Sequence, residues 1–124
     1  MATEPPPRVI VVDDDAAIRD SLSAFLGAAG YEVDAFADGE QFLAAGAHIA
    51  ARGVVIDLNL PGVDGFGVLE RLARYSRGLP PTVLITGRGD AALRRRAITL
   101  GALALLDKPI DGERLVAMLE LAAA

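Results

Sequence analysis

Four short apolar runs in this chain each end in side chains that can do polar chemistry. The first run ends at Asp13 and Asp14, the second at Asp57, the third at Thr86 and the fourth at Lys108, the chain's single lysine. If the runs are parallel strands, these side chains emerge at one edge of one sheet, where open α/β sheets bind ligands. Three acids, a hydroxyl and an ammonium at that edge predict a site for a divalent cation and a phosphoryl group.

The acidic triplet Asp13-Asp14-Asp15 has a structural and a chemical interpretation. An aspartate at a helix start satisfies free N–H groups, and Asp15 is best placed for that role. The other two carboxylates, ~5 Å apart, repel each other by roughly 3 kcal/mol at an effective dielectric near 20. A bound Mg²⁺ turns that repulsion into attraction, because hard oxygen ligands are those Mg²⁺ takes. The metal interpretation is therefore favoured for Asp13 and Asp14.

Asp57, taken alone, is as compatible with an ordinary strand end as with a functional site. Beside the first two acids it becomes a third metal ligand and a candidate nucleophile, since carboxylates accept phosphoryl groups as acyl phosphates. The segment Pro61-Gly62-Val63-Asp64-Gly65 that follows predicts a tight turn into the next helix, with a structural role.

Thr86 and Lys108 also have ordinary interpretations, as a β-forming residue and a solvated surface cation. Gly87 follows Thr86, however, and is expected to leave the threonine hydroxyl unobstructed, while Pro109 restricts the backbone of Lys108. Transferring phosphate oxygens need positive charge and donors already in place, which Mg²⁺, Lys108 and the hydroxyl would supply.

A five-fold alternation of strands and helices must position these residues. Apolar, β-branched runs near 8–13, 31–36, 53–57, 81–85 and 102–106 predict the strands, and three of them lack the polar alternation of a half-exposed strand. This alternation specifies one α/β domain, a doubly wound parallel sheet with helices on both faces. The domain is expected to span 8–124, after a proline-rich leader at 1–7 that is expected to be disordered.

Helical periodicity fills the gaps between the strands. We expect Asp38 and Asp111 to cap helices and Gly30 and Gly101 to follow helix ends. The apolar stripes comprise Ile18, Leu22, Phe25 and Leu26; Phe42 and Leu43 in 39–47; Phe66, Val68, Leu69 and Leu72; Ala91, Ile98 and Leu100; and Leu115, Met118, Leu119 and Ala122.

Composition excludes several classes of function. With 124 residues, no cysteine and one histidine, His48, the chain has neither a disulfide framework nor a thiolate or multi-histidine metal site. A net charge of −5 makes direct nucleic-acid binding by this segment unfavourable. The cluster Arg94-Arg95-Arg96 is interpreted first as a solvated helix face and second as a partner-docking patch. Without a signal peptide or an apolar stretch of about 20 residues, no membrane association is expected and the cytoplasm is the expected compartment.

From Arg8 to Leu121 the chain resembles the receiver domain of bacterial two-component response regulators. The resemblance rests on Val11-Val12-Asp13-Asp14-Asp15, Ile56-Asp57-Leu58-Asn59-Leu60-Pro61-Gly62-Val63-Asp64-Gly65, Leu84-Ile85-Thr86-Gly87, Gly101-Ala102 and Asp107-Lys108-Pro109. It implies a flavodoxin-like (βα)₅ three-layer sandwich with strand order 2-1-3-4-5. It further implies a signalling domain, not an enzyme with turnover, that catalyses only its own phosphorylation and dephosphorylation.

By this resemblance Asp57 is the phosphoacceptor, taking a phosphoryl group from a sensor histidine kinase or a phosphotransfer protein. Asp14 would bind Mg²⁺ directly beside Asp57, Asp13 mostly through water, and Asn59 through its backbone carbonyl. Thr86 and Lys108 would bind the phosphoryl oxygens, and their displacement would change the surface of the fourth helix, fifth strand and fifth helix, through which a homodimer can form.

One departure from the family pattern matters. The family usually has Phe or Tyr three residues before the lysine, and Leu105 at that position puts the usual switch coupling in doubt. Asn59 and Arg88 occupy positions that tune phosphate lifetime in such domains. The segments 85–90 and 111–115 are similar to receivers that precede a helix-turn-helix output domain, so we expect either a stand-alone receiver or the N-terminal module of a longer protein.

Two other functions compete with this hypothesis. A haloacid-dehalogenase-like phosphohydrolase also uses an aspartyl nucleophile and Mg²⁺. That family requires an Asp-x-Asp motif on an early strand, whereas this chain has Asn59 at the second position, and it requires a substrate-covering cap for which this chain has no room. A pseudo-receiver would keep the fold without being phosphorylated, against which the intact site residues argue. Dinucleotide binding is disfavoured because no Gly-x-Gly-x-x-Gly follows the first strand.

Overall fold

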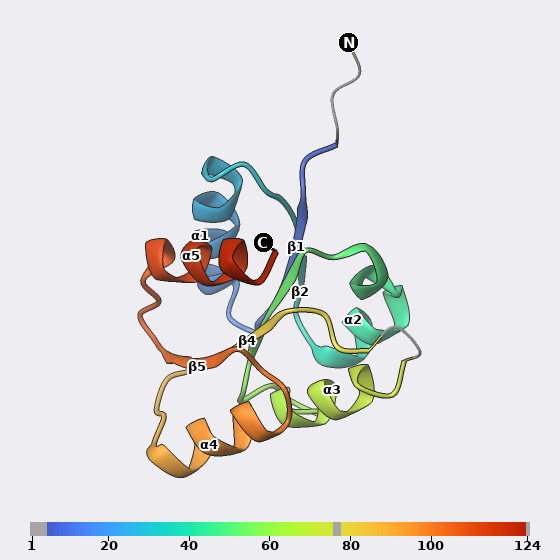
Figure 1. The fold of residues 1–124 in the computed structure, drawn as a ribbon, viewed down its shortest axis with the longest axis vertical. Coiled ribbons are helices and arrows are strands. Elements are labelled where there is room, and N and C mark those ends of the chain that lie inside the picture. The colour runs from blue at the N-terminus through green and yellow to red at the C-terminus, as the bar shows by residue number, and fades with distance from the viewer. Residues whose placement is uncertain (1–4, 76–77, 124) are drawn as a thin grey trace.

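The computed structural model describes residues 5–75 and 78–123, which form a five-stranded parallel sheet covered by helices on both faces (Figure 1). The strands, in the spatial order β2-β1-β3-β4-β5, are β1 (Arg8–Val12), β2 (Glu32–Phe36), β3 (Gly53–Asp57), β4 (Thr82–Thr86) and β5 (Ala104–Asp107). The helices are α1 (Ala16–Ala28), α2 (Gly39–Ala45), the 3₁₀ helix η1 (Ala47–Ala50), α3 (Gly65–Leu72), α4 (Ala91–Thr99) and α5 (Gly112–Ala123). The predicted doubly wound sheet and its strand order are confirmed.

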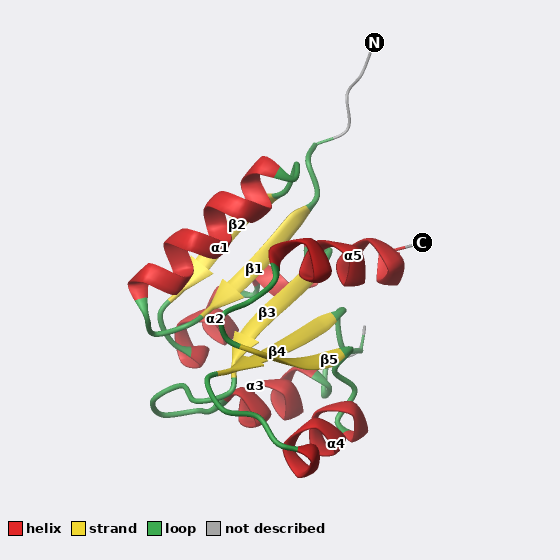
Figure 2. Ribbon diagram, turned by 90° about the vertical axis from the view of Figure 1, so that its left-hand side faces the viewer, coloured by secondary structure: helices red, strands yellow, loops and turns green. Residues whose placement is uncertain are grey.

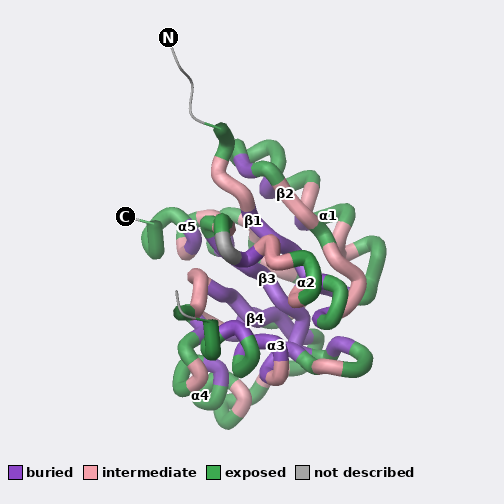
Figure 3. Tube along the Cα trace, turned by 90° about the vertical axis from the view of Figure 1, so that its right-hand side faces the viewer, coloured by how far each residue is buried: buried purple, intermediate pink, exposed green. Residues whose placement is uncertain are grey.

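Side chains of the central strands alternate between two cores, one on each face of the sheet. Every residue of β3 and β4 is buried, as the unbroken apolar runs predicted (Figure 3). One core meets α2, α3 and α4 and includes Ile10, Val54, Ile56, Leu84 and Leu105. The other meets α1 and α5 and includes Val9, Val11, Val55, Val83, Ile85 and Leu106 (Figure 2). Burial on both faces fixes the strand ends from which the polar site residues emerge.

The predicted stripe of α4 is wrong at Ala91 and Ile98, which are exposed, whereas Leu100 packs against the core as expected. Ile98 is 55% exposed, and the one fully buried residue among those described in α4 is Ala97. Three consecutive arginines take up much of this short helix, so it lies on the core through few apolar side chains. Phe25 of α1 is also 41% exposed, because its ring packs over Gly112 at the start of α5 instead of entering the core.

Aspartates begin the five α-helices. Asp15 accepts a hydrogen bond from the Ala17 N–H at 2.9 Å, and Asp38 and Asp111 cap α2 and α5 as predicted. Asp64 and Asp90 do the same for α3 and α4. Since Asp15 alone caps α1, its two neighbours are not needed for that purpose.

The N-terminal leader is described only in part. Residues 1–4 of the predicted 1–7 lie outside the described residues, and 5–7 have no regular structure. The Pro7 carbonyl accepts a hydrogen bond from the Glu32 N–H at 2.8 Å. Across residues 5–75 and 78–123, none of the helices combines the length and apolar character that crossing a membrane demands.

Gly65 marks a close approach of α3 to the loop that follows Asp57. A Cβ at Gly65 would lie 2.7 Å from the Asp57 carbonyl oxygen and 2.8 Å from Leu58 Cα, both of them backbone atoms. Gly65→Ala should therefore destabilise the protein by about 2 kcal/mol in urea unfolding, because one backbone segment must move. Gly27→Ala in α1 meets no atom within 4 Å and should be neutral or stabilising. Equal effects of the two substitutions would contradict this explanation.

His48 is buried, and neither ring nitrogen has a hydrogen-bond partner among the described residues. Its ring lies between Phe42 and Tyr75, and burial lowers its pKa below the ordinary 6.5. The neutral ring is therefore favoured by folding, so stability is present above pH 6.5 and is lost as pH falls.

Unfolding free energies measured from pH 7.5 to 5 should decline for the wild type, at up to about 1.4 kcal/mol per pH unit. The decline should be smaller for His48→Phe, which has no proton to gain. Parallel pH profiles for the two proteins would show that His48 does not titrate in this way.

Candidate metal and phosphoryl site

Strand register brings the predicted site residues to one edge of the sheet. Val12 pairs with Ile56, so Asp13 and Asp57, each the next residue, end neighbouring strands at the same level. Thr86 pairs with Asp107 on β5, and Lys108 follows immediately. The carboxyl ends of β1, β3, β4 and β5 thus deliver the acids, the hydroxyl and the ammonium, as proposed from the strand ends.

The three acids form one cluster. Asp13, Asp14 and Asp57 each offer a carboxylate oxygen, and these oxygens all lie within 4.8 Å of one another. Asp13 is fully buried and Asp57 is 4% exposed, whereas Asp14 is exposed to solvent. Two buried like charges and a third at the mouth repel strongly in this poorly solvated place, so the cluster favours a cation.

Lys108 supplies part of that positive charge. Its Nζ lies 2.9 Å from Asp13 Oδ2 and 3.5 Å from Asp57 Oδ2. Burial alone would lower the pKa of Lys108, but the two carboxylates outweigh burial and the pKa is raised. For Asp57, burial and the charge of Asp13 raise the pKa, and the Asn59 N–H and Lys108 oppose this rise without cancelling it. One ammonium therefore does not neutralise the site.

Asp13 shows most directly where a further cation fits. Its Oδ1 accepts a hydrogen bond from the Asp15 N–H at 2.9 Å, which holds the side chain in place. Its Oδ2 is buried and lies 2.9 Å from the Lys108 ammonium, and no other donor among the described residues bonds to it. A buried carboxylate oxygen with unused lone pairs, next to two more carboxylates, suits a hard divalent cation.

The Thr86 hydroxyl is not unobstructed, which corrects the expectation from Gly87. Thr86 is fully buried, and its Oγ1 accepts hydrogen bonds from Asn59 Nδ2 and from the Arg88 N–H, each at 3.3 Å. The Asn59 backbone N–H also donates to Asp57 Oδ1 at 3.3 Å. The contact between the Asn59 amide and Thr86 was not predicted from the sequence, because the direction of that amide depends on a loop whose backbone no local pattern specifies.

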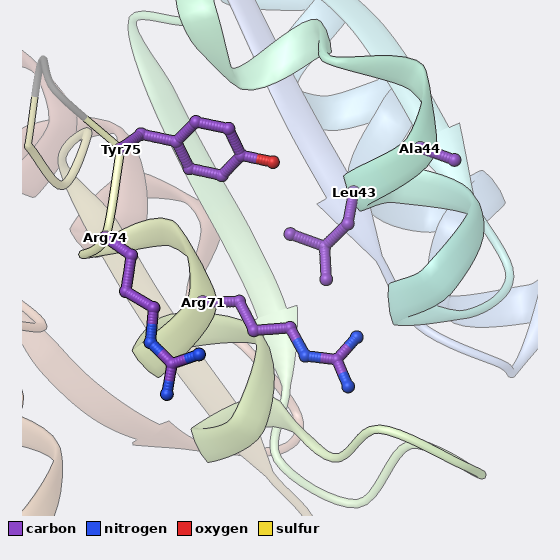
Figure 4. A pocket seen from close by; sticks show the side chains of 5 residues that line it. All are labelled: Leu43, Ala44, Arg71, Arg74 and Tyr75. Atoms are coloured by element: carbon purple, nitrogen blue, oxygen red, sulfur yellow. The ribbon is translucent and has the colours of Figure 1, made fainter.

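Two of the hollows outside the acid cluster lie on the side of the sheet that α2, α3 and α4 cover. One, of about 430 Å³, adjoins Asn59 and is lined by Leu58, Asn59, Leu60, Asp64, Phe66, Leu93 and Arg96. The guanidinium of Arg96 lies 4.3 Å from the centre of the Phe66 ring. The other, of about 460 Å³, lies between α2 and α3 and shares no residue with the site; Leu43, Ala44, Arg71, Arg74 and Tyr75 line it (Figure 4).

The arginine triplet of α4 is exposed, as expected for a solvated helix face. Arg94 pairs with Asp107 at 3.5 Å, and Arg96 pairs with Glu70 at 3.9 Å. Docking of a partner on these arginines stays a prediction.

We compared the sequence and the structure of the chain with those of known proteins. The model of the response regulator receiver domain matches residues 9–120. Over 112 residues the chain is 41% identical to the transcriptional regulatory protein FixJ of Bradyrhizobium diazoefficiens, covering 90% of this chain and 54% of FixJ. The chain thus spans about half the length of FixJ.

Solved structures agree. The chemotaxis response regulator CheY4 of Vibrio cholerae superposes with a TM-score of 0.84 at 28% identity, covering 95% of this chain and 99% of CheY4. The BeF3-activated DrrB receiver domain gives 0.82 at 27% identity, covering 95% and 97%. With a family model that matches nearly the whole chain and a fold shared with both structures, this protein belongs to the response regulator receiver domain family.

Proposed function

We propose that Asp57 accepts a phosphoryl group from a histidine of a sensor kinase or a phosphotransfer protein, with Mg²⁺ bound in the acid cluster. The observation that carries this proposal is the sharing of one ammonium by two buried carboxylates. Lys108 Nζ lies 2.9 and 3.5 Å from Asp13 and Asp57, with Asp14 at the mouth. Such a site is short of positive charge until a cation and a phosphoryl group complete it.

The residues divide the work of transfer. A carboxylate oxygen of Asp57 attacks the phosphorus, a P–O bond forms, and the P–N bond breaks as its electron pair leaves with the histidine. Asp14, Asp57 and the Asn59 carbonyl would hold Mg²⁺, and Asp13 would orient its water. When bound, Mg²⁺ neutralises charge on the carboxylates and phosphoryl oxygens. Lys108 then exchanges its contact with Asp57 for a phosphoryl oxygen.

The Thr86 hydroxyl would donate its proton to the same group. In the structure its oxygen accepts hydrogen bonds from Asn59 and the Arg88 N–H, which leaves the proton to be donated, and we infer that the side chain turns to aim it at a phosphoryl oxygen. We infer that this rearrangement carries the signal to the surface of α4, β5 and α5. Leu105, buried beneath that surface, offers neither a ring nor a hydroxyl, so coupling through an inward-turning aromatic is not available to this chain.

The same surface supports the proposed homodimer. Ile98 of α4 is 55% exposed and Leu103, just before β5, is 40% exposed, so two apolar side chains there face solvent. We place the domain in the cytoplasm, where sensor kinases transfer phosphoryl groups. With a net charge of −5, this segment is not assigned DNA contacts of its own, and any transcriptional output belongs to a longer protein.

Asp57→Asn should abolish phosphorylation. Incubation with acetyl phosphate and Mg²⁺ should add one phosphoryl group to the wild type, seen by intact-protein mass spectrometry, and none to the variant. Asp20→Asn, the same change on an exposed face of α1, should be labelled like the wild type. A labelled Asp57→Asn protein would refute the phosphoacceptor assignment. No labelling of the wild type would favour a pseudo-receiver, and continuous hydrolysis a phosphohydrolase.

The same substitution should stabilise the protein without divalent cations. Burial and Asp13 both raise the pKa of Asp57, so its charged form is disfavoured by folding. Removing that charge should raise the unfolding free energy by about 1 kcal/mol, or Tm by roughly 4 °C. A lower Tm in EDTA would mean that Lys108 stabilises the Asp57 carboxylate by more than burial costs.

Asp14→Ala should weaken Mg²⁺ binding by at least about tenfold, because the site loses a direct ligand. Isothermal titration calorimetry with MgCl₂ measures the change in affinity. Asp20→Ala, which also removes one surface carboxylate, is the control and should bind Mg²⁺ like the wild type. Unchanged affinity in Asp14→Ala would remove this residue from the ligand set.

A further inference from the structure

Asp107 ties the loop between β4 and α4 to the end of β5. Its Oδ1 accepts a hydrogen bond from the Gly89 N–H at 2.8 Å, and its Oδ2 lies 3.5 Å from Arg94 Nη1 at the start of α4. Asp107 precedes Lys108 and pairs in register with Thr86. One carboxylate therefore joins the strand that carries the ammonium to the loop that follows the hydroxyl.

The loop lies directly against Thr86. A Cβ placed on Gly89 would be 2.7 Å from Asp107 Oδ1 and 3.3 Å from the Thr86 methyl group. A hydrogen bond also joins the loop to Thr86: the Arg88 N–H donates to the Thr86 hydroxyl oxygen at 3.3 Å. The side chain of Thr86 and the backbone of 88–89 are thus packed and bonded together, and neither moves far without the other.

We propose that Asp107 is a positioning residue that holds this loop, and through it Thr86, in the conformation of the unphosphorylated domain. The inference rests on the proposed function, since it assumes that Thr86 turns toward a phosphoryl group. That turn moves the oxygen to which the Arg88 N–H is bonded and so displaces the loop, which strains the Gly89 and Arg94 contacts of Asp107. The Asp107 carboxylate thereby opposes activation.

The two contacts of Asp107 are expected to differ in strength. A hydrogen bond from a backbone N–H to a carboxylate is stronger than one between neutral groups. Both contacts are exposed, but the Gly89 bond is 2.8 Å long, whereas the Arg94 pair spans 3.5 Å, and an exposed ion pair contributes little. The Gly89 bond should therefore carry most of the restraint.

The restraint can be measured through the affinity for beryllofluoride, a tetrahedral mimic of the phosphoryl group. Beryllofluoride is titrated into the protein in the presence of Mg²⁺, and binding is followed by ¹⁹F NMR. Asp107→Ala should bind about three- to tenfold more tightly than the wild type, because the loop no longer has to be detached. Asp107→Asn keeps an oxygen for the Gly89 N–H and should lie between the two. Arg94→Gln should show a small gain, and Arg95→Gln, the same change on a neighbour without an Asp107 contact, none.

Amide hydrogen exchange at Gly89, measured without Mg²⁺ or beryllofluoride, tests the restraint separately. Exchange should be faster in Asp107→Ala than in the wild type and in Arg95→Gln. Unchanged exchange, or equal or weaker beryllofluoride binding by Asp107→Ala, would overturn the positioning role and leave the proposed function standing. A wild type that binds no beryllofluoride while Gly89 exchange responds to the substitution would overturn the proposed function instead, and the opposing role of Asp107 with it.

Discussion

Three carboxylates at the carboxyl edge of the sheet share a single ammonium, and this imbalance of charge is the constraint on which the site depends. Asp13 and Asp57 are buried, so water screens their repulsion poorly. The single ammonium of Lys108 lies near both carboxylates and has to balance the two charges at once. The raised pKa values of Asp57 and Lys108 are two consequences of this arrangement. A cation that binds among the three carboxylates would therefore relieve their repulsion.

The two packed cores of the sheet hold the carboxylates close together in spite of their repulsion. Side chains of β1, β3 and β4 alternate between two dense cores, and no central strand can shift register without exchanging its two faces. The strand ends are therefore fixed, and loop residues orient the side chains there, as the Asp15 N–H does for Asp13. Thr86 likewise accepts hydrogen bonds from the Asn59 amide and from the Arg88 N–H.

How far the sequence predicts this molecule depends on the kind of feature. Buried strands such as 53–57 are predicted well, since β-branched runs without polar alternation have few other solutions, and strand ends then place the acids together. The stripe of α4 is mispredicted because three arginines leave one fully buried contact, Ala97. The amide of Asn59 and the carboxylate of Asp107 are missed for a different reason. Their contacts depend on the backbones of the loops that follow β3 and β4, which no local sequence pattern specifies.

The most direct test of the central claim is a crystal structure of the protein soaked in Mn²⁺, which scatters anomalously and shares the oxygen ligands of Mg²⁺. We expect one strong anomalous peak among the carboxylates of Asp13, Asp14 and Asp57. An empty cluster at saturating Mn²⁺, with Lys108 still divided between Asp13 and Asp57, would show that the ammonium alone balances the acids.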